Sequence, residues 1–229
     1  MKGIVASPGI AIGKALIFRK DVQVINCDCI DSSRVEDEIA LYKDAVARSE
    51  EQLHTLAANI RKRLGADKAA IFEAHLDILN DPVLEESVLE KIRNRNISAE
   101  YALDLSVKEI CEMFESLDDP YLKERAADVK DVCSRLMCNI KGTELVSLAN
   151  MEEKCIVVAK DLTPSDTASM DLDKILGFAT DMGGPASHTA ILAKSLGIPA
   201  LVGLKDLSYN VKNGDILIID ALQGEVHIN

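Results

Sequence analysis

His188 is the residue best placed to do covalent chemistry, within residues 183–189, which read Gly-Gly-Pro-Ala-Ser-His-Thr. A neutral imidazole is a competent nucleophile, and a histidine near its unperturbed pKa of about 6.5 is mostly neutral at pH 7. Gly183, Gly184 and the following proline interrupt regular structure, and Ser187 is a favourable N-cap. The pattern predicts a histidine in the first turn of a helix, directly after a glycine-rich loop.

The start of such a helix attracts anions. Its unpaired backbone N–H groups point outward, and the helix dipole adds about half a positive charge there, so phosphate is a natural occupant. These residues together suggest that His188 accepts a phosphoryl group that the helix start stabilises. On the residues alone, the alternative is that Ser187 only caps the helix and His188 is a surface residue.

An α/β arrangement is predicted to position this histidine. The apolar run 175–179 predicts a buried strand that leads into the loop, and Gly197 and Pro199 predict the end of the helix. A further helix is expected after the loop at 162–168. Other apolar runs alternate with these helical segments, which is typical of α/β folds. The additional strand candidates are 155–159, 200–202, 216–219 and 226–228. At the N-terminus, two apolar stretches around Ser7-Pro8-Gly9 predict a β-hairpin that joins the same sheet.

Residues 32–142 have a different pattern and are expected to be almost entirely helical. Apolar residues recur at heptad spacing from Val35 to Ile60, after a capping-box pattern at 33–36. A shorter helix is expected from Asp67 to about Leu79, further helices after Asp81 and Ser98, and a last one that Asp119-Pro120 opens and Gly142 closes. Short connections between these helices favour an antiparallel bundle inserted into the α/β part.

Composition limits the possible partners. The chain has 229 residues and a net charge of −12, which makes nucleic acid and anionic membranes poor partners and favours a basic protein face. No apolar run approaches the roughly 18 residues needed to span a membrane. The six cysteines are irregularly spaced and predict reduced thiols of a cytosolic protein.

The stretch from Gly183 closely resembles the active-site segment of the enzyme I family of the bacterial sugar phosphotransferase system, and the N-terminal Gly-Ile-Val-Ala-Ser-Pro-Gly-Ile-Ala is also similar to that family. The resemblance implies an α/β phosphohistidine (swivelling-type) domain, residues 1–31 and 143–229, with an inserted all-α helical-bundle subdomain, residues 32–142. It also implies that His188 is the phosphorylated residue.

The resemblance implies further site residues. The segment Asp-Leu-Thr-Pro-Ser-Asp-Thr-Ala matches the family segment whose second threonine, Thr167 here, contacts the active histidine. With Nδ1 held by Thr167, Nε2 would be phosphorylated. The phosphoryl-binding residues implied are Gly183, Gly184, Ser187 and Thr189. Pro185 and Ala186 depart from the usual Arg-Thr, which could change the loop and its phosphate contacts.

The helical segment is similar to the part of enzyme I that binds the histidine phosphocarrier protein HPr, with a close match over 121–129. This similarity implies an interface containing Asp67, His75, Ile78, Leu84 and Arg125. Without the family, His75 would be read as a helix-surface histidine, as would His54, and His227 as a surface residue of a strand. The family's glutamates near 66 and at 82–83 are replaced by Ala66, Pro82 and Val83, which could retune partner choice.

The resemblance covers the N-terminal half of enzyme I, so we expect an N-terminal fragment, natural or engineered, that exchanges phosphate with HPr only. The family's C-terminal domain binds phosphoenolpyruvate and Mg²⁺ and would be a further partner; no cofactor and no metal are expected in this fragment. A cytoplasmic monomer is expected. Two alternatives remain open, a phosphohistidine domain of a pyruvate,phosphate-dikinase-like enzyme and a non-catalytic module that binds a carrier protein.

Overall fold

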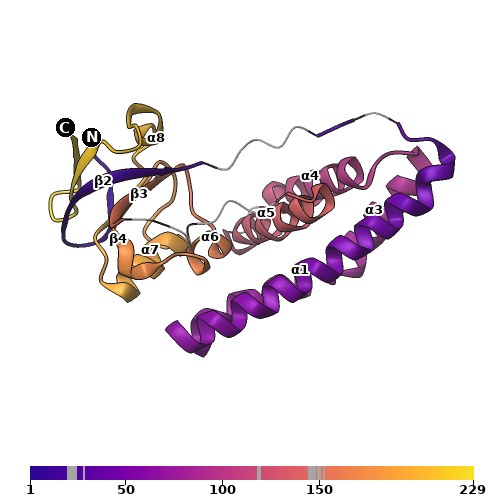
Figure 1. The fold of residues 1–229 in the computed structure, drawn as a ribbon, viewed down its shortest axis with the longest axis horizontal. Helices are drawn as coiled ribbons and strands as arrows, with labels where there is room; N and C mark the ends of the chain where they lie inside the picture. Colours follow the sequence, from indigo (N-terminus) through magenta and orange to yellow (C-terminus); the bar gives the residue numbers. More distant parts are fainter. Residues whose placement is uncertain (20–24, 28, 118–119, 144–147, 149–150, 152) are drawn as a thin grey trace. The chain divides into compact units, whose positions relative to one another are not determined.

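The structure is a computed structural model, and it describes residues 1–229 except 20–24, 28, 118–119, 144–147, 149–150 and 152 (Figure 1). The chain divides into two compact units. Residues 1–21 and 146–229 form an α/β unit, and residues 22–145 form a helical unit. The helical unit is therefore an insertion between two stretches of chain that fold together.

A mixed sheet forms the centre of the α/β unit. Its seven described strands follow the order β1-β5-β4-β3-β2-β6-β7. The neighbours β2-β3-β4-β5 are parallel, and the remaining pairs are antiparallel. A bridge between Lys2 and Glu225 joins the two ends of this order, so the sheet closes on itself. The strands are β1 (Ile4–Ser7), β2 (Ile10–Phe18), β3 (Cys155–Ala159), β4 (Ile175–Thr180), β5 (Ala200–Val202), β6 (Ile216–Asp220) and β7 (Glu225–Ile228).

The predicted N-terminal hairpin is wrong, although both of its strands exist. β1 pairs with β5, where Ile4 lies opposite Val202, while β2 pairs with β3 and with β6, where Ile10 lies opposite Asp220. Gly9, with φ of +140°, provides the turn between them. The two strands diverge after this turn because each finds its partners in the second half of the chain, and local sequence carries no signal for such pairing.

Side chains alternate between the two faces of each strand. A hydrophobic cluster packs against each face of the sheet. On β3, Val157 packs into one hydrophobic cluster with residues of α7 (His188–Leu196), and Ile156 packs into the other with Leu207 of α8 (Leu207–Asn210). All five residues of β3 are buried, as expected for a central parallel strand. Two shorter helical segments, α6 (Pro164–Ala168) and η2 (Leu172–Lys174), complete the unit.

The helical unit follows the predicted order of helices (Figure 1). The predicted apolar face of the first long helix is confirmed, since Ile39, Tyr42, Leu53 and Ile60 are all buried. The elements are η1 (Ser32–Arg34), α1 (Val35–Leu64), α2 (Ala66–Leu79), α3 (Pro82–Arg95), α4 (Ala99–Ser116) and α5 (Pro120–Lys141).

Two of the three side-chain caps predicted among the described residues of this unit are present, and the helix start predicted at Asp119 lies outside the described residues. The Asp81 carboxylate accepts from the Val83 N–H, and the Ser98 hydroxyl accepts from the Tyr101 N–H. The predicted capping box at 33–36 is wrong. The segment η1 precedes α1, and the side chain of Asp31 caps η1. The Asp31 carboxylate accepts from both the N–H and the hydroxyl of Ser33, at 2.9 and 2.7 Å, so the serine hydroxyl does not cap α1.

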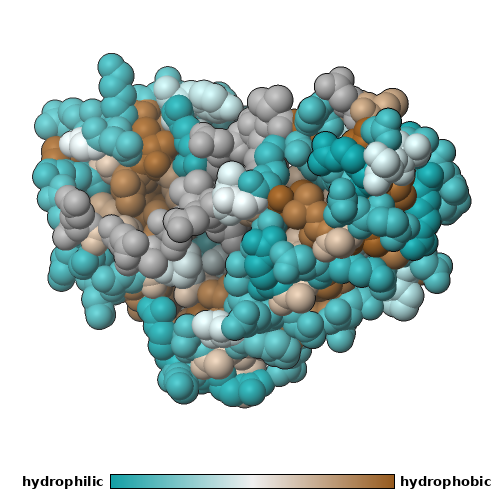
Figure 2. All heavy atoms as spheres, turned by 45° about the vertical axis from the view of Figure 1, so that its right-hand side comes forward, coloured by the Kyte–Doolittle hydropathy of each residue, from teal (hydrophilic) through white to brown (hydrophobic). Residues whose placement is uncertain are grey.

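The negative charge is concentrated in the helical unit. Residues 22–145 contain 16 basic and 26 acidic side chains, a net charge of −10, whereas the α/β unit contains 10 and 12, a net charge of −2. Hydrophilic residues cover most of the face visible in Figure 2, with separate hydrophobic patches between them. No helix in the described residues is long and apolar enough to cross a membrane.

Candidate active site

The loop and helix around His188 have the predicted form. The Ser187 hydroxyl accepts from the Ala190 N–H at 3.4 Å and caps α7, and the Ser187 N–H donates to the Gly184 carbonyl at 3.0 Å. Gly183 has φ of +99° and Gly197, at the end of α7, has φ of +65°, so both take a left-handed conformation that favours glycine. His188 is the first residue of α7 and is half-buried.

The sheet brings Thr167 to this histidine. α6 and α7 begin in loops that leave the carboxyl ends of the neighbouring parallel strands β3 and β4, so both helix starts lie at the same end of these strands. A capping box between Thr163 and Asp166 fixes the start of α6. The buried Thr167 Oγ1 then lies 3.1 Å from His188 Nε2. The predicted contact between these two residues is therefore present in the structure.

The ring nitrogen in this contact differs from the prediction. Thr167 meets Nε2, not Nδ1, because the imidazole extends from α7 toward α6 and its distal nitrogen reaches the hydroxyl. Thr167 Oγ1 also lies 3.0 Å from the Pro164 carbonyl and 3.3 Å from the Thr163 carbonyl. A hydroxyl that donates its one proton to one of these carbonyls accepts from the ring. That arrangement would place the proton of the neutral ring on Nε2 and the lone pair on Nδ1.

The predicted phosphoryl-binding residues surround His188, and two of their side chains have structural contacts. The buried Thr189 hydroxyl donates to the Leu162 carbonyl at 3.2 Å and thereby ties α7 to the loop after β3. The Ser187 hydroxyl caps the helix. Gly184 faces open space, since a Cβ built there meets nothing within 4 Å. Any phosphoryl binding by Thr189 would therefore use its backbone N–H, whereas the Ser187 N–H is already bonded to the Gly184 carbonyl.

Charged side chains near the loop also have defined contacts. Asp181, the carboxylate nearest to the loop in sequence, is buried and accepts from both the N–H and the hydroxyl of Ser208 at the start of α8. The Lys194 ammonium lies 3.5 Å from the Pro185 carbonyl, at the loop that precedes His188. Within the described ranges, no three His, Cys, Asp or Glu side chains cluster in a way that could hold a metal ion. The sequence did not predict the contact between Asp181 and Ser208, because the two residues are distant along the chain. It did not predict the contact of Lys194 with Pro185 because the partner atom is a backbone carbonyl.

The residues predicted at the partner interface divide into two groups. Asp67 is exposed, Ile78 is half-buried, and the Arg125 side chain is 34% exposed. His75 and Leu84 are instead 0% and 2% exposed. In this structure a docked protein would not touch His75 or Leu84. The prediction that their side chains lie at the interface surface is therefore wrong. They are buried because both lie on the inner faces of their helices, which a local pattern did not reveal for His75.

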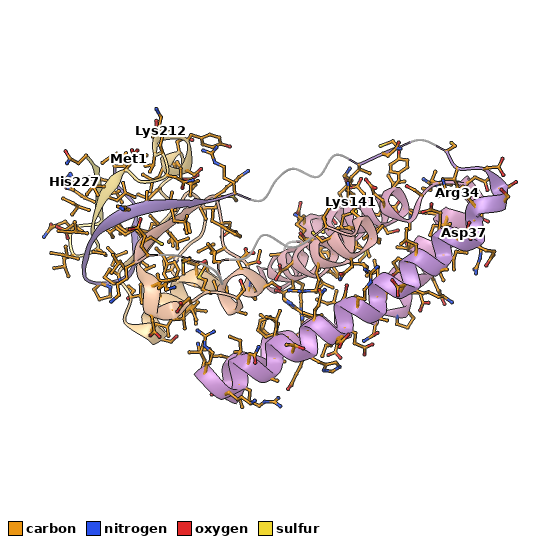
Figure 3. All side chains as sticks on the ribbon, viewed as in Figure 1. Met1, Arg34, Asp37, Lys141, Lys212 and His227 are labelled. Carbon is orange, nitrogen blue, oxygen red and sulfur yellow. The ribbon has the colours of Figure 1, made fainter. Side chains whose placement is uncertain are left out.

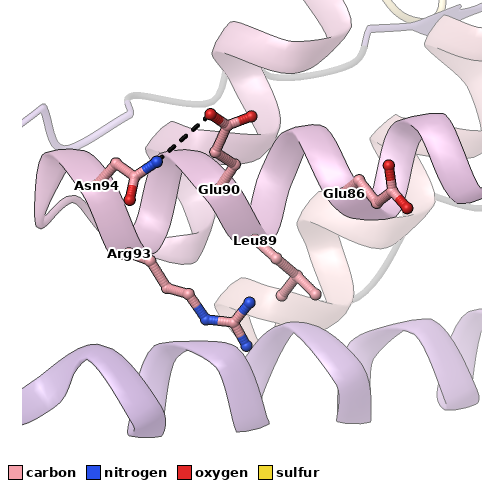
Figure 4. A pocket seen from close by; sticks show the side chains of 5 residues that line it. All are labelled: Glu86, Leu89, Glu90, Arg93 and Asn94. Carbon is pink, nitrogen blue, oxygen red and sulfur yellow. Dashed lines mark hydrogen bonds between the residues drawn. The ribbon is translucent and has the colours of Figure 1, made fainter.

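The other two histidines are exposed, as predicted: His54 lies on α1, and His227 lies on β7 at the outside of the sheet (Figure 3). The described residues that line an open surface pocket of about 360 Å³ in the helical unit all belong to α3 (Figure 4). It contains two carboxylates, Arg93, Leu89 and Asn94, and Asn94 donates to Glu90 at 3.4 Å. None of the predicted site residues lines this pocket.

Comparisons with known proteins agree with this architecture. Residues 2–125 match the family described as PEP-utilising enzyme, N-terminal, and residues 151–224 match PEP-utilising enzyme, mobile domain. The phosphoenolpyruvate-protein phosphotransferases of Geobacillus stearothermophilus and Haemophilus influenzae are 45% and 42% identical over 227 and 229 residues. The chain spans 39% and 40% of their lengths, while the matches cover 99% and 100% of the chain.

Solved structures give the same result. The solution structure of an enzyme I protein, called nEIt, superposes with a TM-score of 0.83 at 46% identity, covering 100% of this chain and 92% of that one. An N-terminal domain of Enzyme 1 - Nitrogen, 23% identical with a TM-score of 0.62, shares the fold. The chain therefore belongs to the PEP-utilising enzymes and corresponds to the N-terminal domain of enzyme I, the phosphoenolpyruvate-protein phosphotransferase.

Proposed function

We propose that the chain accepts a phosphoryl group on His188 and exchanges it reversibly with HPr, as a cytoplasmic component of the phosphoenolpyruvate-dependent sugar phosphotransferase system. The observation that carries the proposal is the placement of His188 as the first residue of α7, with its ring held by Thr167. We further propose that residues 32–142 are the HPr-binding subdomain and that residues 1–31 and 143–229 form the phosphohistidine domain.

The exchange forms one phosphorus–nitrogen bond and breaks another. His188 Nε2 attacks the phosphorus of phospho-HPr while the bond to the HPr histidine breaks, and that histidine recovers its lone pair. Because the same kind of bond is made and broken, the step runs in both directions and needs no metal ion. The N–H groups at the start of α7 favour the added negative charge.

Thr167 has a defined part in this step. Nε2 carries the ring proton in the resting contact with Thr167, so Nε2 becomes a nucleophile only after the ring leaves the hydroxyl and the proton moves to Nδ1. Thr167 thus holds the resting ring in one orientation. Pro185 and Ala186, which follow the two loop glycines, replace the family's usual Arg-Thr, so we expect the phosphoryl contacts to differ there from those of other enzymes I.

The test is incubation of the chain with phospho-HPr, with a chelator present, followed by intact-mass measurement and mapping of the label. One acid-labile phosphoryl group is expected on His188, and unlabelled HPr should remove it. His188→Gln should abolish labelling, whereas His227→Gln, which changes an exposed histidine of the same unit, should not. Binding of HPr without transfer would instead support a non-catalytic module, and a label on any other residue would refute the assignment.

A further inference from the structure

His75 is a fully buried histidine whose two ring nitrogens have no hydrogen-bond partner among the described residues. Nε2 lies 3.6 Å from Asp128 Oδ1 and Nδ1 lies 3.9 Å from Asp131 Oδ2, both on α5. These distances exceed those of a hydrogen bond. Because buried polar groups are nearly always paired, this arrangement favours a small movement that closes one of the two contacts.

Asp128 is the part of this cluster that can move. The His75 ring packs edge-on against Phe72, with centroids 5.7 Å apart and the ring planes at 76°, which restrains the imidazole. The side chain of Asp131 is 3% exposed, and Arg135 is buried one turn further along α5. The Asp128 side chain is 19% exposed and has access to solvent. A shift of about half an ångström to one ångström brings its carboxylate to hydrogen-bond distance of His75.

Asp128 also connects this buried ring to the surface. Its second oxygen, Oδ2, lies 3.9 Å from a guanidinium nitrogen of Arg125, one turn earlier on α5. The Arg125 side chain is 34% exposed. A continuous line of contacts thus runs from His75 in the interior, through Asp128, to a cation that a docking protein can touch.

We propose that His75 is a positioning residue for partner docking: it fixes the Asp128 carboxylate, and Asp128 sets the orientation of the Arg125 guanidinium. This inference rests on the proposed function, in which HPr docks on the helical unit. It assigns the interface role to Asp128 and Arg125, and it predicts that His75 affects docking although no partner can touch it. Sequence reasoning missed Asp128 because its importance depends on the α2–α5 packing.

Two substitutions at 75 separate positioning from simple packing. The amide of glutamine takes the place of Nε2, facing Asp128, whereas the shorter asparagine takes the place of Nδ1, facing Asp131. In phosphoryl transfer between HPr and the full chain, H75N should raise the KM for HPr by about threefold to tenfold, within the range for one lost hydrogen bond of ordinary strength. H75Q should restore most of that loss. The kcat should not change, because His188 lies in the other unit.

A double-mutant cycle tests whether His75 acts through Asp128. D128N should raise the KM as much as H75N does, and the double variant should be no worse than D128N alone. His54→Asn, an exposed histidine on α1, is the matched control and should leave the KM unchanged. Additive effects, an H75N variant with normal KM, or H75Q and H75N variants that are equally impaired would each overturn the inference.

A spectroscopic readout keeps the inference testable if H75N does not fold or if HPr is not the partner. Long-range ¹H–¹⁵N spectra of the free chain should show that D128N shifts the His75 ring nitrogens. Glu73→Gln, an exposed α2 residue paired with Arg61, is the control and should not shift them. Equal shifts in both variants would refute the coupling. Failure of the wild-type chain to exchange phosphate with HPr would refute the proposed function alone.

Discussion

Thr167 Oγ1 lies 3.1 Å from His188 Nε2 and 3.0 Å from the Pro164 carbonyl, so the hydroxyl lies between the ring and a backbone acceptor. We expect the hydroxyl to donate to the carbonyl and to accept from the ring, which would keep Nε2 protonated while the contact lasts. The proposed phosphorylation on Nε2 would then require a change of both tautomer and ring orientation. In this proposal the contact holds Nε2 in a form that cannot attack phosphorus.

The tautomer of His188 can be observed directly. Long-range ¹H–¹⁵N spectra near pH 8 should show a protonated Nε2 and an unprotonated Nδ1. Thr167→Val removes the acceptor and should mix the two tautomers, while the signals of exposed His227 in the same spectrum stay unchanged. A wild-type ring protonated on Nδ1 would mean that Thr167 donates to Nε2, and the resting-state argument would be wrong.

The two loop glycines should respond differently to alanine. Gly183 has φ of +99°, and a Cβ there would lie 3.2 Å from the Ser187 hydroxyl that caps α7. We expect Gly183→Ala to lower the free energy of unfolding of the α/β unit by about 1–2 kcal/mol, from the left-handed strain, and to slow labelling of His188. Gly184 has open space around it, so Gly184→Ala is the matched control for stability and should change the free energy of unfolding little. Urea denaturation and labelling rates test both; equal losses would contradict the strain argument.

The cysteines should divide into two reactivity classes. Cys27 and Cys29 are exposed, the other four are buried, and all six are free thiols. Burial raises the pKa of the Cys111, Cys133 and Cys155 thiols, so their thiolates form only at more alkaline pH. A thiol reagent at pH 7 should modify two cysteines in the native chain and six in urea, by mass spectrometry. Rapid native labelling of Cys133 would show that the core of the helical unit opens.

Association with HPr should depend on salt through the helical unit. Its net charge of −10 attracts a basic face, and screening shortens to about 8 Å at physiological ionic strength, so the association rate should fall as salt rises. Asp77→Lys on α2 should slow association, whereas Asp173→Lys, an equal charge change at an exposed site of the α/β unit, should slow it less. Stopped-flow measurements at low salt decide this; equal slowing would indicate that only total charge matters.

Local patterns determined the elements of this protein. The heptad spacing of α1, the caps Asp81, Ser98 and Ser187, and the glycine that ends α7 are short-range signals, because each depends on residues within one or two turns. The same signals placed His188 at a helix start. The capping box at 33–36 failed because Asp31, just outside the pattern, competes for the hydroxyl of Ser33.

Tertiary structure decided how these elements meet. The sequence predicted β1 and β2 but not their separation, since their partners lie some 200 residues away along the chain. The sequence placed Thr167 beside His188 only through family resemblance, and the predicted ring nitrogen was wrong. Which nitrogen reaches the hydroxyl depends on how β3 and β4 align and so on how far α7 lies from α6. The burial of His75 between α2 and α5 likewise follows from helix packing: a helix pattern shows which residues share a face, but only the packed neighbour decides which face is covered.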